Sequence, residues 1–166
     1  MIGVISDTHD NLKAVDKVLK ILKERGVNTV IHLGDFISPF TLRKFESFRL
    51  YGIFGNNDGE KLLLKSIADE FEFVLEEAPL EIEIEKKNFL LLHGYGSVER
   101  TKKLVRSFAK GGDYNFILYG HTHRVHREKI GETLILNPGE ACGYLSGKRT
   151  IAILDPLKGK IEIIEV

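Results

Sequence analysis

Apolar runs and stretches with helical spacing alternate through the first half of the chain. Three short apolar runs predict strands, at Met1–Ile5, Val27–Leu33 and Tyr51–Phe54. Apolar residues recur at helical spacing between Asn11 and Arg25, and Gly26 ends that pattern, so we predict a helix there. Ser38 followed by Pro39 predicts the start of a second, short helix. This order is typical of a mostly parallel sheet with crossover helices.

The pattern changes to a period of two at Leu80–Glu85, which indicates a strand with one buried face. Phe89–Leu92 and Phe116–Tyr119 are apolar throughout and predict buried strands, and Ser97–Lys110 predicts a basic amphipathic helix between them. Antiparallel strands are predicted for the remainder, at Val125–Ile130, Thr133–Leu136, Arg149–Leu154 and Lys160–Val166. We therefore predict two packed sheets flanked by helices, in a single domain that spans residues 1–166, because no linker or repeat interrupts the pattern.

The charge composition limits the kinds of partner. Lys and Arg number 24 and Asp and Glu number 24 in 166 residues, so the chain has no overall basic field that would collect nucleic acid. The basic helix lacks interleaved aromatic residues, so we interpret its cations as a solvated face and expect no dedicated nucleic-acid-binding surface. An anionic substrate must then be held by a local site.

Cysteine occurs once, at Cys142, which excludes an intramolecular disulfide and indicates a reducing compartment. We expect this residue to be a small buried side chain and not a nucleophile. The chain opens directly into a predicted strand and has no apolar span long enough for a membrane. The sequence therefore predicts a cytoplasmic protein without a membrane partner.

Side chains able to bind metal follow the ends of the strand-like runs. Five separate segments supply them, at Asp7, His9, Asp35, Asn56, His93, His121 and His123. Loops at the carboxyl ends of strands can converge on one cleft, so we expect these side chains to form a single site. Oxygen and imidazole donors without a thiolate suit Mn, Fe, Ni, Co or Zn. Seven donors exceed the needs of one ion, whereas two ions that share one carboxylate would use them all.

The segments GVISDTHDN, VIHLGDF, IFGNND, LLLHGYG and LYGHTH resemble the ordered motifs of the calcineurin-like metallophosphoesterases, in particular the short single-domain bacterial and archaeal phosphodiesterase branch. The resemblance implies a four-layer αββα sandwich, in the α/β class. It also implies two divalent transition-metal ions, with Mn²⁺ as the first expectation and Ni²⁺, Co²⁺, Fe²⁺ and Zn²⁺ as alternatives.

The same resemblance assigns a place to each ligand. One ion would take Asp7, His9 and His123, the other would take Asn56, His93 and His121, and Asp35 would bridge the two. A hydroxide between the ions would attack phosphorus in line, without a covalent phospho-enzyme. Charge that develops on the phosphoryl oxygens would be stabilised by both ions.

Asn57 departs from the family pattern, which carries a His at this position. That His is thought to protonate the leaving oxygen or to stabilise the phosphoryl group. An amide cannot act as a general acid near neutral pH, and loss of such an acid costs roughly 10²–10⁴-fold in rate. We therefore assign catalytic roles to Asp35 and Asn57, and predict weak turnover of alkyl monoesters and better turnover of diesters with good leaving groups.

Other polar residues beside these motifs have both a structural and a functional interpretation. His126 could replace the missing acid, but an ordinary surface His is the better interpretation, and His32 lies inside a strand and is excluded as a ligand. Arg124 could hold a phosphate oxygen or be solvated. The run 137–139, Asn-Pro-Gly, resembles a loop of the short branch in which Ser commonly follows. Glu140 follows here, which weakens a functional claim for this loop.

The sequence thus predicts a metal-dependent phosphodiesterase that acts on small or accessible phosphodiesters. Two alternatives stay open: a phosphomonoesterase of the same family, and an interaction scaffold on the same fold, as in the retromer subunit that shares it. Every ligand type is present, which favours the enzyme. The sequence specifies neither the physiological substrate nor the native metal, and it leaves a homodimer as one option for the oligomeric state.

Overall fold

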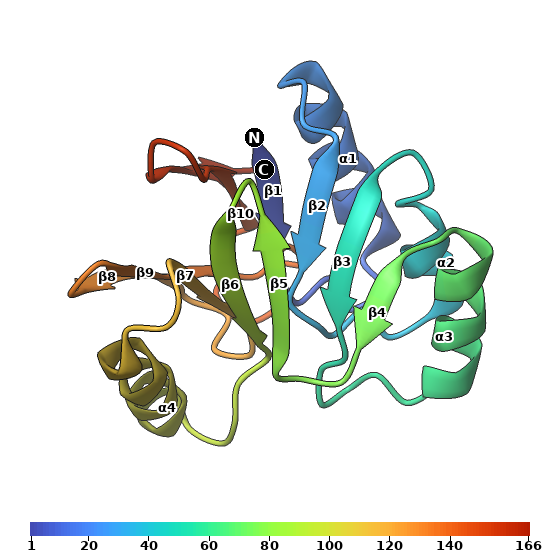
Figure 1. Cartoon of the computed structure of the whole chain (residues 1–166). Coiled ribbons are helices and arrows are strands. Elements are labelled where there is room, and N and C mark those ends of the chain that lie inside the picture. Colours follow the sequence, from blue (N-terminus) through green and yellow to red (C-terminus); the bar gives the residue numbers. More distant parts are fainter.

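Two β-sheets packed face to face form the centre of the protein in the computed structural model, which describes residues 1–166 (Figure 1). The first sheet has six strands in the order β11-β10-β1-β2-β3-β4. They are β1 (Ile2–Ile5), β2 (Thr29–His32), β3 (Arg49–Ile53), β4 (Val74–Glu76), β10 (Thr150–Asp155) and β11 (Lys160–Glu165). The first four run parallel, so their carboxyl ends meet at one edge, and β10 and β11 are added antiparallel.

The second sheet has five strands in the order β5-β6-β7-β9-β8. They are β5 (Leu80–Ile84), β6 (Lys87–Leu92), β7 (Phe116–Tyr119), β8 (Val125–Ile130) and β9 (Thr133–Pro138). The central strands β6, β7 and β9 run parallel, whereas β5 and β8 are antiparallel edge strands. Three carboxyl ends therefore meet at one edge of this sheet as well.

Helices cover the outer face of each sheet (Figure 1). The six-stranded sheet carries α1 (Leu12–Glu24), α2 (Pro39–Arg43) and α3 (Lys61–Glu70), and the five-stranded sheet carries α4 (Val98–Gly111). The side chains of Asn11, Ser38 and Ser97 cap α1, α2 and α4 by accepting a hydrogen bond from the first turn. None of the four helices has the length and apolar character needed to span a membrane.

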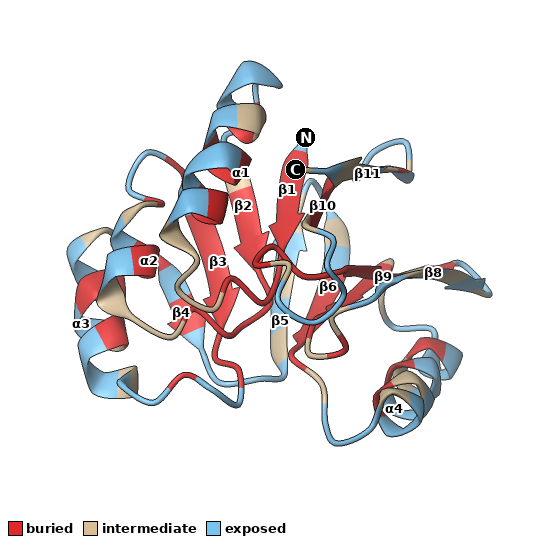
Figure 2. Cartoon of the chain, turned by 180° about the vertical axis from the view of Figure 1, so that it is seen from behind, coloured by how far each residue is buried: buried red, intermediate tan, exposed pale blue.

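The inner strands are buried on both faces, which explains their uninterrupted apolar sequences. In β1, Val4 packs between the two sheets while Ile5 packs under the helices of the first sheet. In β6, Leu91 packs between the sheets while Leu90 packs under α4. Figure 2 shows these buried residues gathered on the strands and on the inward faces of the helices. Three apolar interfaces thus separate four layers, which confirms the predicted αββα sandwich.

One strand was absent from the sequence prediction. β4 has three residues, and only Leu75 of them is buried, so neither its length nor its polarity distinguishes it from a loop. It pairs with β3 and extends the parallel part of the first sheet. The other predicted strands, together with α1 and α4, differ from the observed elements by a few residues at most. α2 ends at Arg43, and turns follow it up to Ser47.

Candidate metal centre

All seven predicted ligands lie on loops that follow the carboxyl ends of parallel strands. The first sheet supplies four of them after β1, β2 and β3, and the second sheet supplies three after β6 and β7. Five of the seven, Asp7, His9, Asp35, His121 and His123, have φ between 42° and 65°. The left-handed region is uncommon for residues other than glycine, although Asp and His adopt it more readily than most. Such conformations cluster at functional sites and persist where the surroundings hold the loops in place.

One group of ligand atoms gathers around Asp7. Its Oδ2 accepts hydrogen bonds from Ser6 Oγ at 2.5 Å and from the backbone N–H of His121 at 3.1 Å. Its Oδ1 lies 3.3 Å from His123 Nε2 and 3.8 Å from His9 Nε2. Asp7 Oδ1 and His9 Nε2 are buried atoms without a hydrogen-bond partner. Buried polar atoms are normally paired, so this unpaired carboxylate and imidazole indicate a cation site.

A second group gathers around Asn56. Its Oδ1 lies 3.0 Å from His93 Nε2 and 2.8 Å from His121 Nδ1. The other nitrogens of these rings face backbone carbonyls, His93 Nδ1 at 2.7 Å from Leu33 O and His121 Nε2 at 2.8 Å from Gly96 O. A carbonyl oxygen only accepts hydrogen bonds, so in each ring the nitrogen that faces the carbonyl carries the hydrogen. The nitrogens that face Asn56 are then the ones free to bind a metal.

Asp35 lies between the two groups. Its Oδ2 is 3.4 Å from His9 Nε2, which belongs to the first group, and 3.5 Å from His93 Nε2, which belongs to the second. Asn57 holds this carboxylate from the opposite side, because its backbone N–H donates to Oδ1 and its Nδ2 donates to Oδ2, both at 2.8 Å. The predicted catalytic residue Asn57 thus contacts the central carboxylate directly.

The central carboxylate and its histidines are coupled electrostatically. Burial disfavours ionisation of Asp35, but the hydrogen bonds and charge of His93 and the bonds from Asn57 outweigh it, so the pKa of this carboxyl lies well below its ordinary value. Burial likewise opposes protonation of His93, and Asp35 reverses the effect, so the pKa of His93 is raised. Asp7 raises the pKa of His9 against burial. The two carboxylates therefore favour positive charge in the site.

Buried polar groups fix the loops that carry Asp35 and Asn56. Asp58 accepts the backbone N–H groups of Asp35 at 2.9 Å, Ile37 at 2.7 Å and Gly55 at 2.7 Å, which ties the β2 and β3 loops together. On the other side, Gly34 N–H donates to His32 Nδ1, and His32 Nε2 lies 3.1 Å from Thr8 Oγ1. His32 thus connects the β1 and β2 loops, a structural role that differs from that of the predicted ligands.

Some of the residues in the candidate site are buried and others are exposed to solvent. Asp7, Asp35 and His93 are buried, whereas Asn56 and Asn57 are exposed. Ligand atoms of the three buried residues lie within 4.8 Å of one another. Two carboxylates, one amide and four imidazoles match the preferences of divalent transition metals, and the open side leaves room for a substrate.

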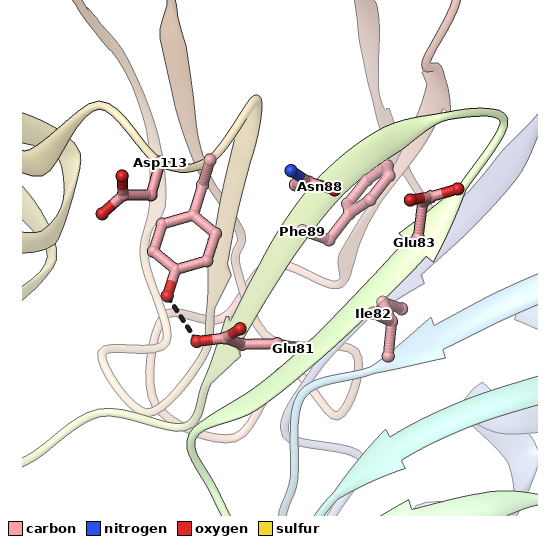
Figure 3. Close-up of a pocket in the computed structure, with 7 residues that line it drawn as sticks. Glu81, Ile82, Glu83, Asn88, Phe89 and Asp113 are labelled. Atoms are coloured by element: carbon pink, nitrogen blue, oxygen red, sulfur yellow. Dashed lines mark hydrogen bonds between the residues drawn. The ribbon is translucent and has the colours of Figure 1, made fainter.

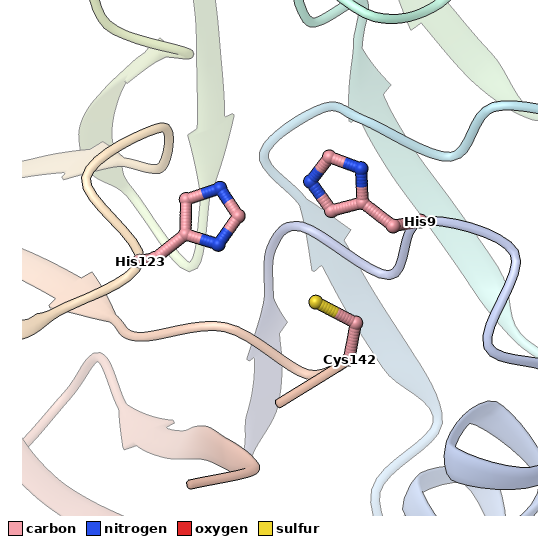
Figure 4. Close-up of side chains that lie close together, drawn as sticks. All are labelled: His9, His123 and Cys142. Atoms are coloured by element: carbon pink, nitrogen blue, oxygen red, sulfur yellow. The ribbon is translucent and has the colours of Figure 1, made fainter. Parts of the chain in front are cut away.

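Cys142 lies beside His9 and His123, and the three donor atoms are within 4.8 Å of one another (Figure 4). Its Sγ nevertheless donates to Glu140 Oε2 at 3.0 Å, and burial together with Glu140 raises the pKa of the thiol to about 12. We therefore leave Cys142 outside the ligand set. It is fully buried, which agrees with the predicted small buried side chain.

Both ring nitrogens of His126 have partners outside the group of predicted ligands. Its Nδ1 lies 2.8 Å from the hydroxyl of Tyr119, and its Nε2 lies 3.3 Å from Glu128, which in turn accepts from Arg106 of α4. Both ring nitrogens are therefore engaged on the α4 side of the second sheet. Arg124 is exposed at the start of β8.

Glu140 is a functional candidate that sequence reasoning set aside. It follows the carboxyl end of β9, is fully buried, and its Oε2 lies 2.7 Å from His123 Nδ1. The signal that pointed to it was present, because β9 ends at the same edge of the sheet as β6 and β7. The sequence analysis nevertheless gave Glu140 no role, because Ser is the residue that commonly follows Asn-Pro-Gly in the short branch.

A hollow of about 650 Å³ lies apart from these ligands, along β5 and β6 (Figure 3). Its lining consists of Glu81, Ile82, Glu83, Asn88, Phe89, Asp113 and Tyr114. The hydroxyl of Tyr114 donates to Glu81 at 2.5 Å. Three carboxylates make this hollow unsuitable for an anionic substrate, so the chemistry is assigned to the strand ends.

A family model described as the calcineurin-like phosphoesterase superfamily domain matches residues 1–159. The chain belongs to this superfamily. It is 39% identical over 160 residues to the phosphodiesterase MJ0936 of Methanocaldococcus jannaschii, a match that covers 95% of this chain and 93% of the relative. It is 28% identical over 141 residues to a probable metallophosphoesterase of Mycoplasma pneumoniae, with 82% of this chain and 76% of the relative covered.

Solved structures agree with this family assignment. An archaeal phosphodiesterase matches this phosphoesterase with a TM-score of 0.90 and 37% identity, over 99% of both chains. Vps29 of Chaetomium thermophilum matches with a TM-score of 0.71 over 99% of this chain and 96% of that one. At 17% identity, the likeness to Vps29 shows the fold alone. The family and the sandwich fold predicted from the five motifs are therefore confirmed.

Proposed function

We propose that this calcineurin-like phosphoesterase hydrolyses small or accessible phosphodiesters with two divalent transition-metal ions. One ion would be held by Asp7, His9 and His123, and the other by Asn56, His93 and His121. Asp35 would bridge them. Mn²⁺ is the first candidate, and Ni²⁺, Co²⁺, Fe²⁺ and Zn²⁺ bind the same donor types. Residues 1–166 would act as one metallophosphoesterase domain, since both sheets contribute ligands.

The position of Asp35 carries this proposal. One oxygen, Oδ2, lies within 3.5 Å of imidazole nitrogens from two different ligand groups, His9 and His93. A carboxylate can bind two cations at once and offset part of their charge, which a neutral imidazole cannot do. The unpaired buried atoms of Asp7 and His9 support a cation in the first group. When bound, two such ions supply an activated water nucleophile and stabilise the charge on phosphoryl oxygens.

The residues of the chain set the substrate preference. Asn57 donates one of its side-chain N–H groups to Asp35, so it positions the bridging carboxylate, and an amide cannot protonate a leaving group near neutral pH. A leaving oxygen must then depart without help from this position, which favours acidic leaving groups. The name of the relative from Methanocaldococcus jannaschii, a phosphodiesterase, supports a diester substrate. We also propose a cytoplasmic location, which suits a lone buried thiol.

Hydrolysis of an activated aryl phosphodiester, compared with the matching monoester, tests the proposal. Metal-stripped protein would be resupplied separately with Mn²⁺, Ni²⁺, Co²⁺, Zn²⁺ or Mg²⁺. We expect metal-dependent cleavage that favours the diester. Asp35→Ala should abolish both cleavage and metal binding, whereas Asp69→Ala, which removes an exposed carboxylate of α3, should leave both intact. Two bound ions without any cleavage would instead support a binding protein on this fold.

A further inference from the structure

Glu140 is a buried carboxylate surrounded by hydrogen-bond donors from one loop and by one imidazole. It is fully buried. From the loop at residues 142–146 it accepts hydrogen bonds from Cys142 Sγ at 3.0 Å, Tyr144 N at 3.1 Å, Leu145 N at 3.0 Å, Ser146 Oγ at 2.6 Å and Ser146 N. The remaining partner is His123, whose Nδ1 lies 2.7 Å from Oε2.

A buried carboxylate requires hydrogen-bond donors, and the loop at residues 142–146 supplies most of those around Glu140. Transfer of an unpaired carboxylate out of water costs several kcal/mol, which explains the number of donors around Glu140. The loop donors alone explain why the loop adopts its shape. They do not explain why the carboxylate also contacts a residue of a different loop, at the end of another strand, and why that residue is one of the proposed metal ligands.

The contact fixes how the His123 ring is oriented. A carboxylate only accepts, so Nδ1 of His123 carries a hydrogen and donates it to Glu140. In the neutral ring the lone pair is then on Nε2, which lies 3.3 Å from Asp7 Oδ1. Two acceptors that face each other at this distance repel unless a cation lies between them. The ring is thus set in the orientation and tautomer that a metal ion in the first group requires.

We propose that Glu140 is a positioning residue for the first metal ion, acting through His123, an inference that rests on the proposed two-metal function. The second group has no such carboxylate, because His93 and His121 donate to the backbone carbonyls of Leu33 and Gly96. A side-chain substitution can therefore disturb the orientation of His123 while it leaves the second ion unaffected. This asymmetry is what makes the role of Glu140 measurable.

Glu140 also connects the ligand to the wall of the site. The loop that it organises carries Tyr144, whose ring centroid lies 6.5 Å from that of His9. The same loop binds the β1 loop, because Cys142 N donates to the carbonyl oxygen of Asp7 at 3.1 Å. Figure 4 shows Cys142 of this loop next to His9 and His123. Through its hydrogen bonds, Glu140 therefore connects His123, the Tyr144 loop beside His9 and the β1 loop that carries Asp7.

Calorimetric titration of metal-free protein with Zn²⁺ and with Mn²⁺ tests this role. Wild type should bind two ions. Glu140→Gln should weaken one of the two sites by ten- to one-hundred-fold, the range seen when an outer partner of a metal-binding His is removed, and leave the other site unchanged. Glu128→Gln is the matched control, because Glu128 faces His126, which is not a ligand. It should bind both ions like wild type.

Two further measurements separate ligand orientation from loop structure. Ser146→Ala removes a loop hydrogen bond to Glu140 but keeps the contact between Glu140 and His123. It should therefore lower the affinity for the first ion far less than Glu140→Gln does. Nitrogen-15 NMR of His123 in metal-free wild type should show a hydrogen on Nδ1, a result that needs no variant to fold.

The outcomes distinguish this inference from the proposed function. A wild type that binds fewer than two ions would contradict the two-metal site itself. Two ions in wild type together with unchanged affinities in a folded Glu140→Gln would overturn the role of Glu140 alone. The role would also be overturned by equal losses in Ser146→Ala and Glu140→Gln, or by an Nδ1 of His123 that carries no hydrogen.

Discussion

Asn57 binds the carboxylate of Asp35, the proposed bridge, with both its backbone and its side chain, and these two bonds have different consequences for substitution. Asn57→Ala keeps the backbone bond and loses the other, so we expect metal affinity to fall by about tenfold, equivalent to one hydrogen bond to a charged group. Asn57→His restores an acid at this position, so monoester turnover should rise by tenfold or more.

Steady-state rates on aryl and alkyl esters, with metal saturating, check this prediction. The gain in Asn57→His should be largest for alkyl monoesters, whose leaving groups need protonation most. The activated diester serves as the internal control and should change least. Rates that stay the same on every substrate would show that the missing acid does not limit turnover.

The raised pKa values of His9 and His93 predict proton release on metal binding. Both rings hold a proton to higher pH than an ordinary His, because Asp7 and Asp35 favour the charged form. A metal ion binds only the neutral ring. Affinity should therefore rise with pH until the raised pKa values are passed and then level off. Asp35 contributes no proton, because its pKa lies below the ordinary value and it is ionised throughout.

Calorimetry in two buffers with different ionisation enthalpies measures the number of protons released. We expect net release at pH 6 and less at pH 8. His126→Gln is the control and should release as many protons as wild type, because burial lowers the pKa of His126 and this ring lies outside the proposed ligands. Equal heats in both buffers at pH 6 would rule out protonated ligands in the metal-free protein.

At the scale of single residues, the sequence predicted which side chains converge but not what supports them. Asp7, Asp35 and His93 could be placed because each follows a recognisable strand. The contacts of Asn57 with Asp35 and of Glu140 with His123 depend on how loops fold back after their strands. Loop conformation follows from left-handed backbone positions and buried donors, and neither has a simple period in the sequence.

At the scale of elements, the β2 and β3 loops approach so closely that a glycine is required between them. A Cβ atom on Gly55 would lie 2.5 Å from the backbone nitrogen of Asp35, closer than real contacts allow. The β3 loop would have to move away from the bridging carboxylate in Gly55→Ala. We expect at least a tenfold loss of metal affinity and a loss of about 1–3 kcal/mol in the free energy of unfolding, as for other overpacked sites.

Metal titration and urea unfolding of metal-free protein measure the two effects separately. Gly59→Ala is the matched control, since a Cβ atom there meets nothing within 4 Å. It should behave like wild type in both assays. Wild-type affinity in Gly55→Ala would mean that the two loops can separate without disturbing Asp35.

The elements themselves were predictable where a buried face or a cap marked them. The apolar spacing of α1 and the Ser38-Pro39 start of α2 gave the correct elements and starting points. The three-residue strand β4 carried no such signal, because two of its residues, Val74 and Glu76, are exposed. Its place is set by pairing with β3, which is a tertiary interaction.

At the scale of the whole molecule, the two sheets meet at the metal site. Four proposed ligands come from loops of the first sheet and three from loops of the second, and their contacts cross the interface, as in the pair of Asp35 and His93. The sequence predicted two packed sheets from its strand patterns. It did not predict that the parallel edge of one sheet meets the parallel edge of the other, because no local pattern encodes sheet order.

Because its ligands span both sheets, metal binding should stabilise the entire fold. A ligand present at about 100 times its Kd adds about 2.7 kcal/mol to the free energy of unfolding, which raises the melting temperature of a domain of this size by roughly 5–10 °C per ion. Thermal unfolding in EDTA and in excess Mn²⁺ or Zn²⁺ measures the difference. Asp35→Ala should melt at the same temperature in both. A metal-dependent shift that persists in Asp35→Ala would place the stabilising ions elsewhere, whereas its loss would locate them where the sheets meet.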